Sequence, residues 1–378
     1  MTAHLEEQER TRPGVDLKAL WRPVLFFATS RVFVVLAFVA AAATRRKLSY
    51  HSASSKWDGG FYFTIANDGY PSHVPHMKSV LAFFPGYPLA IRLFENILHK
   101  DAYFASTVVV FAFGLAATCC VWYLTRELSN VEAADRATAL FAFAPGSFVL
   151  SMAYTEAVFT LFAVATCWAL IRRRWFLAGI LGALGTATRP DGMALVLAAA
   201  AAGFIAVRER REWRALVAVP LAASGFVAVQ VYLWRHTGDL FAFFHAERYG
   251  WHQGTTFTGT EIADIRAIVR AASHGGPPDW NHIVLLAGFV IFVAASVVLI
   301  RWRPPLELTV YALAMGAFAF ASTRVGFRPR TFLAAFPLAM ALGVKMRRGP
   351  WFALVLAASA ASLILLAYVT TATLYVTP

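Results

Sequence analysis

The most regular feature of the sequence is a series of apolar segments separated by short polar or basic ones. Most segments approach the roughly 17–25 residues of helix needed to cross a hydrocarbon core about 30 Å thick. Hydropathy therefore predicts an all-α polytopic membrane protein with about eleven transmembrane helices. Their expected ranges are 22–44, 102–125, 136–152, 154–171, 175–188, 190–207, 214–235, 281–300, 305–322, 331–346 and 350–374. Because no internal repeat is visible, we expect one domain over residues 22–378, preceded by a tail of residues 1–21.

Composition supports a membrane protein and removes the need for a nucleic-acid partner. Hydrophobic residues make up 59% of the chain and charged residues 15%, against about 45–50% and about 25% in soluble domains. The formal net charge of +13 would suggest nucleic acid in a soluble protein. Here the basic residues are spread between apolar segments, as in the loops of membrane proteins. Cys119, Cys120 and Cys167 lie inside apolar segments and are expected to be buried hydrophobes.

The basic residues also orient the predicted bundle. If the N-terminus and residues 1–21 are cytoplasmic, all the inner loops are basic, as the positive-inside rule requires. These loops hold Arg126, Arg172, Arg173, Arg174, Arg208, Arg210, Arg211, Arg214, Arg301, Arg303, Lys345, Arg347 and Arg348. We therefore expect a multi-pass cell-membrane protein whose two long loops, about 45–101 and about 236–280, are extracytoplasmic. Pro85 and Pro88 interrupt the apolar residues of the first loop, which predicts a helix in the interface plane there.

The first long loop carries a carboxylate in an unusual setting. Trp57 and Asp58 stand directly before Gly59 and Gly60, just beyond the first predicted helix. The glycines permit close backbone approach, so Asp58 could act as a general base on a bound hydroxyl at the membrane surface. Alternatively, Asp58 caps the helix that follows, a position that Asp favours. The local sequence leaves both interpretations open.

Two further outer turns carry charged side chains. Tyr154 and Glu156 lie in a turn between two apolar segments, and Arg189 and Asp191 lie in another. A charge near membrane depth is costly and is a functional candidate by default. The alternative for Arg189 is that it pairs with Asp191 within its own turn.

The last outer turn is rich in arginine. Arg324, Arg328 and Arg330 lie there against the positive-inside bias. Arginine presents a planar fork that suits phosphate oxygens, so these side chains are candidates for binding an anionic phosphate. The alternative is that they extend toward lipid headgroups from the ends of helices.

Aromatic side chains supply candidate substrate contacts in both long loops. Phe84 and Tyr87 in the first loop could contact a lipid or serve as interfacial anchors, and Trp251 in the second could stack on a sugar. His245 and Glu247 lie near Trp251, but no metal-ligand spacing fits. We predict no cofactor and no metal site, and leave open whether a divalent ion takes part.

Taken in order, these motifs resemble the GPI mannosyltransferase II (PIG-V-like) family and its bacterial relatives, over roughly residues 30–345. The resemblance rests on Trp57-Asp58, Ile65-Ala66, Gly69-Tyr70, Phe83 to Pro88, Tyr154 to Glu156, Thr188 to Gly192, Gly238 to Phe243 and Arg324 to Pro337. It implies a GT-C-type bundle that transfers mannose from a polyprenyl-phosphate carrier to an acceptor hydroxyl at the extracytoplasmic face. The family's first-loop acid corresponds to Asp58. A bacterial host without the GPI glycan needs another acceptor, such as a glycolipid or another cell-envelope glycan.

We therefore expect an inverting mannosyltransferase in which Asp58 is the general base. Donor phosphate binding is expected from Arg324, Arg330, Arg189 and Arg328, and substrate contacts from Trp57, Glu156, Tyr154, His245, Trp251, Phe84 and Tyr87. One alternative is a transporter or lipid flippase with an arginine-lined outer phosphate site, and another is a scaffold subunit. The sequence has no P-loop, dinucleotide-binding glycine motif or nucleophile elbow, which disfavours a nucleotide-driven pump.

Overall fold

The computed structural model describes residues 17–44, 50–256, 260–274, 276, 279–323 and 325–373. This part of the chain is built from helices, and no β-strand occurs in it beyond an isolated bridge between Thr255 and Ser322. The all-α prediction is therefore confirmed. Residues 1–16 of the expected N-terminal tail lie outside the described residues, and a short 3-10 helix, η1 (Leu17–Leu20), leads into the first long helix.

Within these described residues, six helical segments are long and apolar enough to cross a membrane. They are α2 (Trp21–Thr44), α6 (Ala102–Leu128), η4 (Pro190–Gly192) with α10 (Met193–Arg210), η5 (Trp213–Val217) with α11 (Ala218–Thr237), α14 (Trp280–Trp302) and α18 (Pro350–Ala372). Two shorter apolar helices stand beside them, α9 (Trp175–Thr186) and α15 (Leu306–Ala321). Several spans are thus present where hydropathy predicted them, and the number eleven stays a prediction.

The predicted span 136–152 is not one continuous helix. α7 (Val131–Ala142) ends three residues before Pro145, which begins the 3-10 helix η3 (Pro145–Ser151). The axis then turns by 109° into α8 (Glu156–Ile171). Proline lacks the N–H that a helix interior needs and clashes with the preceding turn, so the apolar run continues while the helix does not.

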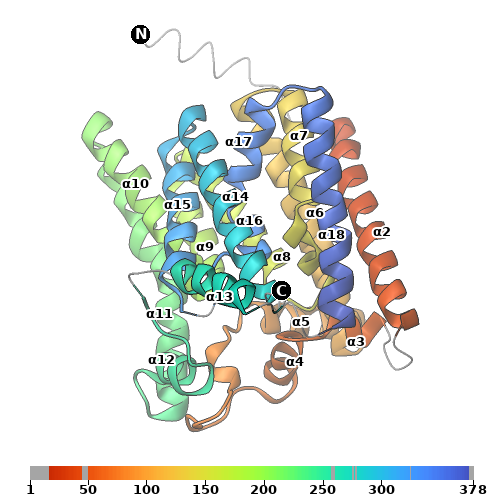
Figure 1. The fold of residues 1–378 in the computed structure, drawn as a ribbon. Coiled ribbons are helices and arrows are strands. Elements are labelled where there is room, and N and C mark those ends of the chain that lie inside the picture. Colours follow the sequence, from red (N-terminus) through yellow and green to blue (C-terminus); the bar gives the residue numbers. More distant parts are fainter. Residues whose placement is uncertain are drawn as a thin grey trace.

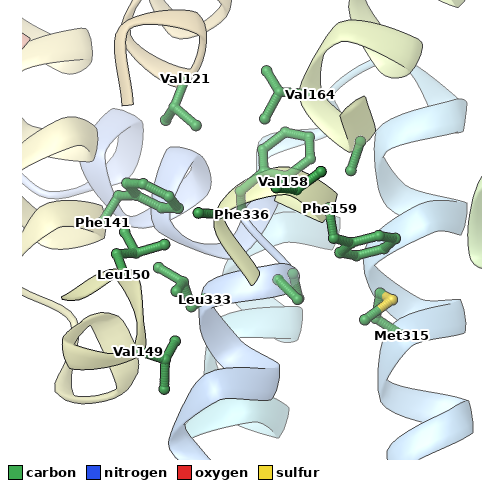
Figure 2. Packing of buried hydrophobic residues seen from close by; sticks show 14 of the residues in the cluster. Val121, Phe141, Val149, Leu150, Val158, Phe159, Val164, Met315, Leu333 and Phe336 are labelled. Carbon is green, nitrogen blue, oxygen red and sulfur yellow. The ribbon is translucent and has the colours of Figure 1, made fainter. Parts of the chain in front are cut away.

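The predicted span 331–346 is broken in the same way. α16 (Pro329–Ala334) and α17 (Pro337–Lys345) are separate helices, and Pro337 begins the second. Figure 2 shows that the two breaks meet in the hydrophobic core. Leu150 of η3 and Phe336, directly before α17, are both 0% exposed among buried side chains of α6, α7 and α8.

A buried arginine of α2 supports the broken segment. Arg31, only 3% exposed, donates to the backbone oxygen of Ser147 at 2.5 Å and to that of Ala142 at 3.2 Å. It also donates to the hydroxyls of Ser147 at 2.9 Å and Ser151 at 3.1 Å. Backbone oxygens freed at a helix break must find donors inside a membrane. Arg31 supplies them, so this intramembrane charge has a structural role.

The short helices of both long loops gather at one end of the bundle (Figure 1). They are α3 (Tyr50–Ser54), α4 (Gly59–Asp68), η2 (Val80–Ala82), α5 (Gly86–Leu98), α12 (Ala242–His245), the π-helical turn η6 (Ala246–Gly250) and α13 (Glu261–Ser273). The helix expected between residues 80 and 98 is present as α5. Its exposed Leu89, Leu93 and Ile97 form a stripe at helical spacing, as in a helix that lies along an interface.

Candidate active site

Asp58 lies at the start of α4, at the end of the bundle where the short helices gather (Figure 1). Its side chain makes no hydrogen bond to the first turn of α4. The carboxylate instead accepts a hydrogen bond at Oδ2 from Nη1 of Arg330, at 3.0 Å. Asp58 therefore occupies the N-cap position of α4, as the alternative expected, but its side chain does not cap the helix. Because the side chain keeps 24% of its surface exposed, a substrate can still reach it.

The turn before Asp58 is fixed from two sides. Trp57 has a left-handed backbone conformation with φ of 66°, and its indole N–H donates to the carbonyl of Thr370 in α18 at 3.1 Å. The backbone N–H of Ala153 donates to the carbonyl of Ser54 at 2.8 Å. The indole nitrogen of Trp57 thus anchors the turn, and only the partly exposed ring is available to a substrate.

Arg330 joins Asp58 to a second acid, Glu156. Glu156 begins α8 and is 0% exposed, and its Oε1 lies 3.7 Å from Nε of Arg330 and accepts a hydrogen bond from Arg189. Among the described residues, its Oε2 is buried without a hydrogen-bond partner. A buried carboxylate needs compensating charge, so the two arginines hold Glu156 and are held by it.

The guanidinium of Arg189 is largely occupied. Nε and Nη2 donate to the two oxygens of Asp191 at 2.8 and 2.7 Å, which confirms the pairing within the turn. Nη1 donates to Glu156. A fork engaged by two carboxylates has little capacity left for phosphate, so the geometry suits Arg189 to positioning Glu156.

The helix break at η3 brings Arg330 to Asp58. A Cβ atom on Gly146 would lie 2.2 Å from the backbone of Pro329, so only glycine lets η3 pack this closely against the start of α16. Just beyond η3, the ring of Tyr154 lies 5.5 Å from the Arg330 guanidinium. The Tyr154 hydroxyl accepts a hydrogen bond from the backbone N–H of Asp58 at 3.3 Å.

A second arginine of the same turn lies beside this cluster. Arg328 is partly buried, and its Nε donates to the carbonyl of Val325 at 3.0 Å. Burial, followed by the positive charge of Arg330, lowers the pKa of Arg328 to about 10. The negative charge of Asp58 opposes this shift in part, and the side chain stays protonated near neutral pH. Arg324, the third candidate of this turn, lies outside the described residues.

Two predicted aromatic contacts lie in the protein interior. Phe84 and Tyr87 are 1% and 0% exposed. Phe84 packs against Phe226 and Phe243, with ring centroids 5.6 and 5.2 Å apart. The Tyr87 hydroxyl is hydrogen bonded to Ser106 at 2.8 Å. Both side chains support the site from behind and offer no exposed ring face to a substrate here.

The second long loop contributes through Trp251. Its ring packs edge-on against Phe61 in the first turn of α4, with centroids 5.1 Å apart. Its indole N–H donates to the carbonyl of Ser79 at 3.3 Å. Nδ1 of His245 instead lies 2.6 Å from Oδ2 of Asp239, a pairing within the loop itself. The fold therefore brings Trp251, more directly than His245, to the helix that carries Asp58.

Glu247 is a candidate that the sequence did not single out for catalysis. It lies in η6, a π-helical turn, a geometry that is rare and frequent at functional sites. Its backbone carbonyl accepts hydrogen bonds from the N–H groups of Trp251 and Gln253. Burial, and next the negative charge of Asp58, raise the pKa of Glu247 to about 7. A second carboxyl group that can carry a proton near neutral pH thus lies within electrostatic range of Asp58.

The charged side chains of the site, Asp58, Glu156, Arg189, Asp191 and Arg330, are held by ion pairs with one another. In the described part of the chain, no group of three or more His, Cys, Asp and Glu side chains is arranged to hold a metal ion. The expectation that no metal or other cofactor takes part is untested and stays a prediction.

An apolar groove reaches Arg328, the arginine beside this cluster. A cavity of about 750 Å³ runs between α14, α16, α17, α18 and η3, and Arg328 and Trp280 are among the residues that line it. The α18 side chains that line it run from Val355 to Val369, a length of about 21 Å at about 1.5 Å per residue. The other lining residues are almost all apolar, among them Leu140, Ile291, Phe292, Phe332, Leu342, Leu365 and Leu366. The groove is therefore long and hydrophobic, with a positively charged side chain, Arg328, in its lining.

Solved membrane glycosyltransferase structures share this fold. ArnT from Cupriavidus metallidurans, solved with undecaprenyl phosphate, aligns with a TM-score of 0.54 and 14% identity over 87% of this chain and 61% of that chain. The oligosaccharyltransferase of Archaeoglobus fulgidus in its apo form aligns with a TM-score of 0.50 and 16% identity, over 91% of this chain and 56% of that chain. The bundle is thus of the GT-C type.

Sequence comparison identifies the family. The GPI alpha-1,6-mannosyltransferase 2 of Cricetulus griseus is 29% identical over 152 residues, and that of Rattus norvegicus is 27% identical over 158 residues. Each match covers 38% of this chain and 30% of the relative, so the chain spans about a third of the length of these curated relatives. The family model described as Mannosyltransferase (PIG-V) matches residues 17–237, more than half of the chain. The protein therefore belongs to the PIG-V mannosyltransferase family.

Proposed function

We propose that this protein transfers a mannose from a polyprenyl-phosphate donor to an acceptor hydroxyl at the extracytoplasmic membrane surface, with inversion at the anomeric carbon. The observation that carries the proposal is the position of Asp58. Its partly exposed carboxylate is held by Arg330 at 3.0 Å, and Arg328 beside it lines the apolar groove. The proposal assigns Asp58 as general base, the arginines as phosphate site and the groove as binding site for the lipid.

The groove supports a lipid-linked donor. Its apolar walls between α14 and α18 suit an isoprenoid chain, and Arg328 in its lining suits a phosphate. The ArnT structure of similar fold contains undecaprenyl phosphate. A sugar bound through such a phosphate would extend past Arg328 toward Asp58.

The proposed reaction is a single displacement. Asp58 takes the proton of the acceptor hydroxyl while the acceptor oxygen attacks the anomeric carbon of the mannose. The bond between that carbon and the phosphate oxygen breaks, and its electron pair leaves with the polyprenyl phosphate. Attack from the face opposite the leaving group gives inversion.

The arginines of the site divide into two roles in this mechanism. Arg330 and Arg328 neutralise the charge that develops on the departing phosphate, in a partly buried setting where such stabilisation is large. Arg189, whose fork is held by Asp191 and Glu156, keeps Glu156 in place under Arg330. We assign Trp251, which lies beside α4, to contact with a glycolipid or cell-envelope glycan acceptor.

The extracytoplasmic assignment follows from the basic residues at the other end of the bundle. α6 ends with Arg126, α10 with Arg208 and Arg210, and α14 with Arg301 in its last turn. α4, which begins at Asp58, lies with the other short helices at the opposite end of the bundle (Figure 1). Under the positive-inside rule, the basic end is cytoplasmic and the Asp58 end extracytoplasmic.

Glu247 gives the proposed reaction a pH dependence. Below its pKa of about 7 the carboxyl is neutral, and above it the side chain adds a negative charge next to Asp58. Because the donor is an anionic phosphate, we expect kcat/KM for the donor to fall about fivefold as pH rises through 7, corresponding to about 1 kcal/mol. The variant Glu247→Gln should lack this step. Initial rates at subsaturating donor between pH 6 and pH 8.5 measure it, and equal profiles for the two proteins contradict the assignment.

The test of the function is sugar transfer by the purified protein in nanodiscs. Radiolabelled polyprenyl-phosphate mannose, polyprenyl-phosphate glucose and GDP-mannose are each offered with a lipid extract of the host, and products are separated and their linkage read by NMR. We expect transfer from the mannosyl lipid alone, giving an α-linkage from a β-linked donor.

Other outcomes redirect the assignment. A β-linked product from a β-linked donor contradicts inversion, and transfer from GDP-mannose contradicts the lipid-linked donor. Absence of transfer from every donor, together with movement of a fluorescent polyprenyl phosphate across proteoliposome membranes, would assign lipid transport instead.

A further inference from the structure

Helix α13 (Glu261–Ser273) exposes its apolar side chains and buries its acidic ones. Glu261 and Asp264 are 7% and 4% exposed and face the rest of the protein. Ile262, Ile265 and Val269 are 51%, 45% and 60% exposed. Their spacing places the three on one stripe of the helix. A loop helix surrounded by water would carry the reverse pattern. The exposed apolar stripe therefore favours surroundings that are less polar than water.

The buried face of α13 is tied to the helix beside the groove. Oδ1 of Asp264 lies 2.7 Å from Nδ1 of His282 in the first turn of α14. Figure 1 shows α13 crosswise to the long helices, in front of the bundle and next to the start of α14. Trp280, at the start of α14, is 62% exposed and lines the groove. Tryptophan is enriched where a membrane meets water, so α13 lies at the depth of the interface.

Basic side chains flank the apolar stripe. Arg266 and Arg270 are exposed one helical turn apart, and neither forms an ion pair with any residue of the described chain. Around the helix, the order is the protein-facing acids, the apolar stripe and then the two arginines. An interfacial helix shows this order when its apolar edge enters the membrane and its basic edge meets lipid phosphates.

We infer that α13 binds the bilayer surface on the Asp58 side of the membrane, with a preference for anionic lipids. The stripe of Ile262, Ile265 and Val269 lies at the boundary of headgroups and acyl chains. Arg266 and Arg270 contact the phosphates of anionic lipids, the partner that two exposed positive charges select. Through Asp264 and His282, this contact fixes the helix beside the groove. The inference stands independently of the sugar-transfer function.

Two cysteine variants test which edge of α13 enters the membrane. In a background with Cys119, Cys120 and Cys167 replaced by Ala, the variants Ile265→Cys and Ala263→Cys each receive an environment-sensitive fluorophore. Both positions are exposed, and a separation of two residues places them about 200° apart around the helix. In nanodiscs, we expect spin-labelled lipids to quench the label at residue 265 and iodide to quench the label at residue 263.

Equal quenching of both labels by iodide would overturn the inference. A label at residue 265 that is open to iodide in nanodiscs but protected in native membranes would also overturn it, and would assign the stripe to a protein partner.

A charge variant tests the lipid preference. Hydrogen exchange of residues 261–273 is compared in nanodiscs of phosphatidylcholine alone and with one third phosphatidylglycerol. Wild type should exchange about tenfold more slowly with the anionic lipid, and the double variant Arg266→Gln, Arg270→Gln should show the same exchange in both. Equal exchange rates of wild type in the two lipid compositions would overturn the preference for anionic lipid.

Discussion

Replacing Asp58 by Asn is expected to lower kcat for mannose transfer by about 10³-fold while KM for the donor changes little. General-base catalysis contributes about 10²–10⁴-fold to a rate, and the amide of Asn cannot accept the proton of the acceptor hydroxyl. The isosteric amide can still accept the hydrogen bond from Arg330 that the carboxylate accepts at 3.0 Å, so the local packing survives. Initial rates at saturating lipid-linked mannose in nanodiscs measure the effect.

The matched control is Asp101→Asn. Asp101 is an exposed carboxylate at the start of α6, where its side chain caps the helix, and the same change of carboxylate to amide there should leave kcat within about twofold. Thermal unfolding of both variants confirms that they are folded. Asp58→Asn with more than about a third of the wild-type kcat would remove Asp58 from the mechanism as its base.

Replacing Arg330 by Gln is expected to lower kcat by about 10²-fold or more and to destabilise the protein by about 3 kcal/mol. The rate falls because loss of one preorganised donor from a charge-stabilising site costs about 10²–10³-fold. The stability falls because Glu156, 0% exposed, loses one of two positive neighbours, and breaking a buried pair costs about 3–5 kcal/mol. Kinetics at the permissive temperature and the midpoint of thermal unfolding separate the two effects.

A conservative variant and a double variant sharpen this test. Arg330→Lys keeps the charge but cannot match the planar fork, so it should recover stability more fully than rate. If Arg330 acts on the leaving phosphate as well as on Asp58, the Asp58→Asn, Arg330→Gln protein should be slower than either single variant. A double variant no slower than Asp58→Asn would mean that Arg330 works through Asp58 alone.

Which residues meet at the site could be predicted from the sequence only in part. Alternation of apolar spans and basic loops put Asp58, Glu156, Arg189 and Arg330 on the same end of the bundle, because each lies in a predicted outer turn. Their pairing could not be read this way. Asp58 and Arg330 are 272 positions apart, and their contact depends on how distant helices pack.

The role of Asp58 itself shows where local sequence becomes ambiguous. An Asp before two glycines fits a helix cap and a general base equally well. The tertiary contact with Arg330 shows that the side chain is turned away from the first turn of α4, and the role of Asp58 as a base stays a prediction. The helix breaks had a local signal in Pro145 and Pro337, but the apolar composition continued across both, and hydropathy alone joined the pieces.

The environment of the aromatic and acidic loop residues could not be predicted from the sequence for a related reason. Phe84 and Tyr87 look the same in sequence whether they line a substrate channel or support it, and burial assigned them to the core. Glu247 stood in the sequence as one acid among several. Its pKa is raised by burial in the folded loop and by the negative charge of Asp58. Neither effect can be predicted from the residues next to Glu247 in the sequence.

The hydrogen bonds of Arg31 set an order for the biogenesis of the protein. The carbonyls of Ala142 and Ser147 are synthesised more than 110 positions after Arg31, and inside lipid they have no water to bind them. α2 must therefore already be in the bilayer when the segment of α7 and η3 is inserted. Otherwise the backbone carbonyls of that segment would enter the lipid without hydrogen-bond donors. The turn that carries Tyr154 and Glu156 follows directly on this segment, so assembly of the candidate site depends on a helix that contributes no residue to it.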